Sequence, residues 1–156
     1  MRINNENVYG LENAIRCSKF PMAVNIENVN SDITNTSKLL GSSKQGSGDD
    51  NYLNGIVVQF DLTFSIKAWT ESERYHFLDF ISSQSTMHRI SRFDIKEQCN
   101  EYVTENTINE VERLKNIYLD TKDKEDYLRL LYNVPTGFQL TAGMTTNYRQ
   151  LKTIYW

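Results

Sequence analysis

The chain has 156 residues, of which 39% are hydrophobic and 24% charged, the usual make-up of one globular domain. Its formal net charge of −3 argues against a general nucleic-acid-binding protein, which would carry a basic surface. Two cysteines without CxxC spacing exclude a disulfide framework, and no run approaches the roughly 18 apolar residues of a membrane span. We therefore expect a cytoplasmic protein without membrane contact.

The first third of the chain predicts two short helices and a loop. Residues 11–22 form the first helix, which should end ahead of Pro21 because the residue before a proline disfavours helical backbone. A second helix begins after Ser31 or Asp32. Residues 41–55 then mix Gly, Ser, Asp and Asn, which is typical of a mobile surface loop. The stretch before this loop is too short for its own core, so we predict one domain over residues 1–156.

The clearest strand covers residues 57–67, VVQFDLTFSIK, in which apolar and polar residues alternate strictly. Such alternation predicts a strand of a sheet with one face packed on a core. Thr70 follows, with Glu73 three residues later, which is the pattern of a capping box. We therefore predict a helix from Thr70 through the apolar residues that end at Ile81.

The second half predicts three helices and one short strand. Thr107 and Glu110 signal the first helix, Tyr127 to Leu131 mark the second, which stops before Pro135, and residues 145–156 have the pattern of the third. The segment FQLTA, bracketed by Gly137 and Gly143, reads as a turn or short strand. The last helix lacks a C-cap, as if the natural protein continued. The order of elements predicts an α+β fold, with one antiparallel sheet packed against several helices.

Three blocks together resemble the flavin-dependent thymidylate synthase family. They are AIRCS (14–18), FSIKAWTESERYHF (64–77) and PTGFQLTAGMTTNYRQL (135–151), in the order and spacing of the family's own blocks. The resemblance implies the fold of that family, a homotetramer with sites shared between subunits, and binding of FAD and dUMP. It also implies that Asn147 and Arg149 contact an adenine or a phosphate.

The family's signature, however, is mostly lost from this chain. Where family members hold the flavin with Arg-His-Arg, an ungapped match places Leu78, Asp79 and Phe80. Ser83 keeps the first serine of the signature, while a later serine becomes His88 and the final Arg-Tyr falls on Ile90–Ser91, or on Arg92–Phe93 if two residues are inserted. The family's downstream phosphate-binding arginine becomes Thr141.

These changes remove a cationic clamp and add an anion. Arginine binds phosphate through paired, charge-assisted hydrogen bonds. A carboxylate about 4 Å from a phosphate instead costs about 4 kcal/mol at an effective dielectric near 20. That is half of the roughly 8 kcal/mol that makes a micromolar affinity. We therefore predict a shared fold without the family's chemistry and expect no cofactor; FAD would be bound only under the alternative of an active enzyme.

Polar residues that remain could bind a ligand, and each has a structural alternative. His88, Arg89 and Arg92 could grip a phosphate-bearing ligand or an acidic partner, or could simply lie at a solvated helix end. For each of the other candidates, a role in helix capping or a simple surface position is the alternative to ligand binding. The candidate ligand-binding set is Arg16, Ser18, Arg74, Ser83, His88, Arg89, Arg92, Asn147 and Arg149; we predict no catalytic residue and no metal site.

The main hypothesis is a catalytically degenerate homo-oligomer that binds a nucleotide-like small molecule or a host protein. A phage origin and a role against host defence are an extension of this hypothesis that no residue supports directly. The alternative is an active FAD-dependent enzyme acting on dUMP, with Arg74, His88, Arg92 and Arg149 as relocated binding groups. A structural or regulatory oligomer without a ligand is the third hypothesis.

Overall fold

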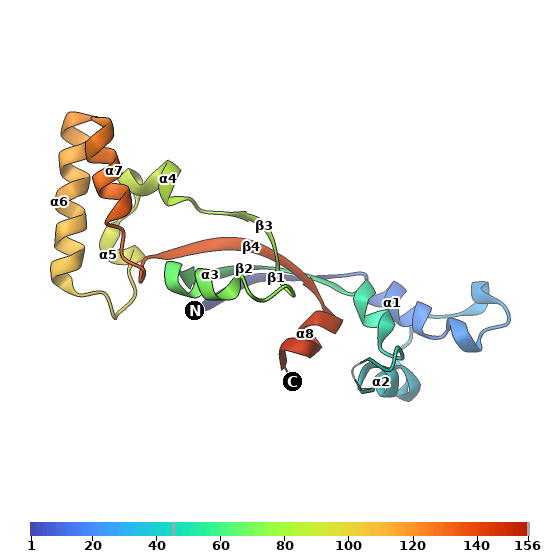
Figure 1. The fold of residues 1–156 in the computed structure, drawn as a ribbon. Coiled ribbons are helices and arrows are strands. Elements are labelled where there is room, and N and C mark those ends of the chain that lie inside the picture. Colours follow the sequence, from blue (N-terminus) through green and yellow to red (C-terminus); the bar gives the residue numbers. More distant parts are fainter. Residues whose placement is uncertain (45, 156) are drawn as a thin grey trace. The chain divides into compact units, whose positions relative to one another are not determined.

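A computed structural model describes residues 1–44 and 46–155 (Figure 1). Four strands form an antiparallel sheet in the order β1-β2-β4-β3. The strands are β1 (Arg2–Tyr9), β2 (Val57–Ser65), β3 (Asp79–Ser83) and β4 (Gln139–Asn147). The α-helices are α1 (Leu11–Ser18), α2 (Asn35–Gly41), α3 (Ile66–Ser72), α4 (Thr86–Arg89), α5 (Ile95–Gln98), α6 (Glu105–Thr121), α7 (Lys124–Tyr132) and α8 (Tyr148–Tyr155). The predicted α+β class, with one antiparallel sheet and several helices, is confirmed.

The chain divides into two compact units. One comprises residues 1–4, 61–75 and 80–143, and the other comprises residues 5–60, 76–79 and those from 144 onward. Each of the four strands contributes residues to both units.

The first unit is built around the α6–α7 hairpin, whose helices lie side by side in Figure 1. Thr104 caps α6 by accepting a hydrogen bond from the Thr107 backbone, so the cap lies three residues before the predicted Thr107 and the helix begins at Glu105. Asp123 caps α7 in the same way. Apolar faces of these helices meet residues from the preceding helical turns and the residue just before β4 in one core: Ile90, Ile95, Val111, Leu114, Leu130 and Phe138.

The second unit packs α1 against the 3₁₀ turn η3 (Asn51–Gly55). Its core is small and contains Ala14, Leu53 and Ile56, with Tyr52 against it. Gly10 caps α1 with a φ of 77°, and a Cβ there would collide with the Gly55 carbonyl oxygen. Only glycine meets both demands without strain. Helix α8 joins this unit through the Tyr148 N–H, which donates to the Ile56 carbonyl at 3.0 Å.

Strand β2 matches its prediction closely. It runs from Val57 to Ser65, and Val58, Phe60 and Leu62 on the predicted apolar face are buried. Thr63 on the opposite face is buried as well, because its hydroxyl pairs with that of Thr141 on β4 at 2.8 Å. Thr141, which stands where the resembled family has a phosphate-binding arginine, is therefore paired with a threonine of the neighbouring strand.

The helix predicted from Thr70 to Ile81 is wrong. Ser65 accepts a hydrogen bond from the Ala68 N–H, so α3 begins at Ile66 and ends at Ser72. Residues 79–83 then form β3, which pairs with β4 at the end of the sheet. Pairing with β4 prevails here over the helical spacing of the apolar residues, since strand formation depends strongly on neighbours.

Strands β1 and β4 also differ from expectation. Strand β1 was not predicted, because all eight of its residues are exposed and its sequence, RINNENVY, shows no alternation. Strand β4 extends from Gln139 to Asn147, through Gly143, rather than stopping before that glycine. The helices over residues 11–18, 35–41 and 124–132 lie close to where the patterns placed them, whereas the last helix begins at Tyr148 because residues 145–147 belong to β4.

Candidate functional site

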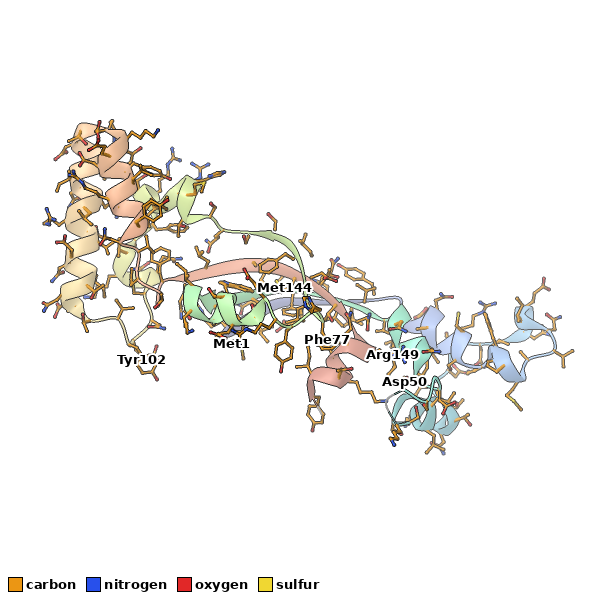
Figure 2. The ribbon with its side chains drawn as sticks, viewed as in Figure 1. Met1, Asp50, Phe77, Tyr102, Met144 and Arg149 are labelled. Carbon is orange, nitrogen blue, oxygen red and sulfur yellow. The ribbon has the colours of Figure 1, made fainter. Side chains whose placement is uncertain are left out.

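The buried carboxylate of Asp50 organises the C-terminal part of the second unit. Asp50 is 0% exposed, although it belongs to the loop predicted to be a surface segment. Lys152 of α8 approaches its Oδ2 at 2.8 Å, and the Arg149 Nε lies 3.2 Å from its Oδ1. Figure 2 shows Asp50 and Arg149 next to each other. Lys152 also donates to the Ser43 carbonyl at 2.6 Å, so α8 holds the loop at two points.

This cluster holds one anion between two cations. Arg149 comes close enough for an ion pair, but its N–H is not aligned for a hydrogen bond, and Oδ1 receives none from the described residues. The hydrogen bond from Lys152 lowers the pKa of Asp50 and outweighs burial, which acts in the opposite direction. Nearby, burial raises the pKa of Tyr52, and the charge of Asp50 adds to this shift. Asp50 therefore stays ionised at neutral pH and neutralises part of the charge of Arg149.

Acid should weaken the ion pairs that Asp50 forms with Lys152 and Arg149. Because the pKa of Asp50 is lower in the folded than in the unfolded chain, its stabilising contribution is complete above the unfolded value near 3.9. The contribution is lost as the pH falls from there through the folded pKa. We expect urea unfolding to show a steeper loss of free energy of unfolding below about pH 4 in the wild type than in Asp50→Asn. Equal acid slopes in the two proteins would contradict this assignment.

A cavity of about 820 Å³ opens in the same unit. Its walls come from the end of α1, the 3₁₀ turn η1 (Phe20–Met22), α2 and the segment before Tyr52. Several of its hydroxyls already serve the fold: Ser18 donates to the Ile15 carbonyl at 2.6 Å, and Tyr52 to the Ser37 carbonyl at 2.8 Å. The lining residues are Cys17, Ser18, Lys19, Pro21, Met22, Thr34, Thr36, Ser37, Leu40, Gly48, Asp49, Asn51 and Tyr52.

The wall of this cavity suits binding better than catalysis. Cys17 is its one strong nucleophile among the described residues, and no histidine lies in the lining to activate the thiol. Lys19 and Asp49 bring one charge of each sign, and the Lys19 ammonium is engaged by Asn30. The volume lies in the range of small-molecule pockets, with apolar walls and a few polar groups.

The predicted ligand-binding residues of this unit have structural partners. Arg16 donates to the Ile26 carbonyl at 2.9 Å and lies over the Phe20 ring. Ser18 lines the cavity. Asn147 accepts a hydrogen bond from the Gln150 N–H and so caps α8, and Arg149 pairs with Asp50.

The remaining candidates belong to the first unit and do not form one cluster. Arg74 forms an exposed ion pair with Glu71 at 3.7 Å, and Ser83 lies on β3 beside a separate pocket. His88 and Arg89 lie in the last turn of α4, and Arg92 ends the 3₁₀ turn η4 (Ile90–Arg92). All three are exposed, and within residues 1–44 and 46–155 no hydrogen bond or ion pair joins them to another side chain.

Similarity to solved structures identifies the fold. A flavin-dependent thymidylate synthase, ThyX from Helicobacter pylori, solved with FAD and dUMP, superposes with a TM-score of 0.74 at 13% identity. The match covers 98% of this chain and 82% of that one. The fold is that of flavin-dependent thymidylate synthase. No protein-family model and no curated protein sequence matches the chain.

The UMP/dUMP methylase PolB from Streptomyces cacaoi shares this fold more distantly. Its complex with 5-Br UMP gives a TM-score of 0.59 at 10% identity, covering 95% of this chain and 74% of PolB. The complex with 5-Br dUMP gives 0.57 at 12% identity, with 96% and 74% covered. At such identities the thymidylate synthase fold is shared, and the chemistry has to be argued from this chain's own residues.

Sequence reasoning missed Asp50 and Lys152. Asp50 lies in the segment 41–55, whose composition predicts a mobile surface loop rather than a buried charge. Its partners lie about 100 residues further along the chain, so no local pattern reveals the pairing. No helix in the described part of the chain is long and apolar enough to span a membrane, and no group of three or more described His, Cys, Asp or Glu residues could hold a metal ion.

Proposed function

We propose that this protein keeps the thymidylate synthase fold, has lost the flavin-dependent methyl transfer, and acts by binding a nucleotide-like small molecule. The observation that carries the proposal is that the positions matching the resembled family's anion-binding residues hold side chains that cannot bind an anion or are already paired. Asp79 and the 53%-exposed Phe80 begin β3 where the resembled family has cations. Thr141 pairs with Thr63, and Arg149 is paired with the buried Asp50.

FAD does not fit these residues. A pyrophosphate needs guanidinium or backbone donors that are free to turn toward it. Asp79 would repel it, and the Phe80 ring offers no donor. The proposal therefore includes no flavin and no catalytic residue. The homo-oligomer implied by the family resemblance belongs to the same proposal, and a protein partner is the competing outcome if no small molecule binds.

The 820 Å³ cavity is the proposed place for the ligand. It is large enough for a nucleoside or nucleotide, and it is lined by Ser18, one of the residues expected at a nucleotide pocket. The lining carries one charge of each sign, Lys19 and Asp49, which favours the sugar and base over a highly charged phosphate chain.

A thermal-shift screen of nucleosides and nucleotides tests this proposal. A ligand at about 100 times its Kd stabilises by about 2.7 kcal/mol, which should raise Tm by roughly 5–10 °C. Thr36→Trp, on the cavity wall, should abolish the shift by filling the space. Lys38→Trp on the same helix is the matched control and should preserve it, because Lys38 is exposed and does not line the cavity.

Two results would contradict the proposal. If no nucleoside or nucleotide stabilises the protein, the nucleotide-binding role is wrong and a protein partner becomes the better hypothesis. If calorimetry detects dUMP binding that Arg92→Ala abolishes, the signature region still binds substrate, and the active-enzyme alternative is favoured.

A further inference from the structure

A second pocket lies in the other unit, between α3, β3 and β4. Its volume is about 300 Å³, at the lower end of the range for small-molecule sites. Trp69 and Phe80 form an aromatic pair in its wall, with ring centroids 5.0 Å apart and planes tilted by 47°. Glu73, at the end of α3, and Gln84, after β3, also line it. Phe80 is 53% exposed, so its ring is accessible from solvent.

The walls of this pocket are held in place by the fold. The Trp69 indole N–H donates to the Leu140 carbonyl at 3.1 Å, and the Phe64 ring packs edge-on against Trp69 with centroids 5.1 Å apart. Gln84 exchanges two hydrogen bonds of 2.9 Å with the Thr141 backbone, one through its own N–H and one through its Oε1. An aromatic surface fixed in this way can bind a ligand without first being ordered.

The charge of the pocket is negative. Glu73 is the one ionisable group among the described residues that line it, and no ion pair from the described residues neutralises this carboxylate. A phosphate would be repelled here, whereas a cation would meet both a carboxylate and two aromatic faces, whose quadrupoles attract positive charge.

We propose that this pocket binds an organic cation, a guanidinium or a substituted ammonium group. The aromatic pair supplies cation–π contact and Glu73 supplies the counter-charge. The pocket is large enough for such a head group and too small for a dinucleotide. This site lies in a different unit from the 820 Å³ cavity, and the inference stands whether or not a nucleotide binds there.

Tryptophan fluorescence of the full chain tests this inference. The chain has two tryptophans, so the Trp156→Phe background leaves Trp69 as the single reporter. The probes are tetramethylammonium chloride, N-acetyl-arginine amide and its neutral isostere N-acetyl-citrulline amide. We expect saturable changes with the two cations and none with citrulline. Glu73→Gln should weaken cation binding about 5- to 10-fold, on the order expected for one carboxylate at a partly exposed site.

The matched control is Glu71→Gln, which removes the same charge from the same helix. Glu71 pairs with Lys67 at 2.6 Å and does not line the pocket, so this change should alter the Kd by less than about twofold. A short peptide with one central arginine distinguishes the source of the cation: binding at least tenfold tighter than that of the capped amino acid indicates a protein side chain, and equal binding indicates a free small cation. Equal response to citrulline, or no effect of Glu73→Gln, would overturn the inference.

Discussion

Replacing Asp50 with asparagine is expected to lower the free energy of unfolding by about 3–5 kcal/mol, the usual effect of breaking a buried ion pair by removing one partner. The carboxylate is completely buried and takes a hydrogen bond from Lys152, whose side chain is only 14% exposed. Without Asp50, the Lys152 ammonium keeps the Ser43 carbonyl but loses its counter-charge. Urea unfolding at pH 7 measures the difference.

Two variants make this prediction specific. Asp49→Asn removes the same charge from the neighbouring, exposed position and should change the free energy of unfolding by less than about 0.5 kcal/mol. The double variant Asp50→Asn/Lys152→Met removes the unpaired cation as well and should recover a large part of the loss, because the two residues are coupled. Equal effects of Asp50→Asn and Asp49→Asn would show that the buried pair does not hold α8 to the loop.

The elements that sequence patterns predicted well are those whose signal is local. Strand β2 alternates over nine residues, and α7 combines an apolar stripe with the Asp123 cap and the stop before Pro135. Such features are set by period and capping, which operate within a few residues. The helix at residues 70–81 failed because the same apolar residues fit β3, and only pairing with β4 decides between the two.

The candidate site was predictable only in part, because its defining contacts are long-range. Ser18 and Ser83 do line pockets, and both came from the family resemblance rather than from a local motif. Arg149 was expected near a phosphate, but its anion is the carboxylate of Asp50. The negative charge of the Trp69–Phe80 pocket could not be predicted from the sequence either, since its walls come from α3, β3 and β4, and β4 is far from the other two along the chain.

Loss of flavin binding is the second large effect that we expect. Replacing an arginine clamp by Leu78, Asp79 and Phe80 removes paired hydrogen bonds and puts a carboxylate near the pyrophosphate position. The repulsion alone, about 4 kcal/mol at 4 Å, corresponds to roughly 10³-fold in Kd. A micromolar affinity would thereby fall to about the millimolar range before the missing guanidinium contacts are counted.

The visible absorbance spectrum of the purified protein, followed by an FAD titration read by flavin fluorescence, tests the central proposal most directly. We predict a colourless protein, with no flavin band and no saturable quenching at FAD concentrations up to about 1 mM. A yellow protein, or one that binds FAD with micromolar Kd and bleaches on reduction, would contradict the proposal that methyl transfer has been lost from this thymidylate synthase fold.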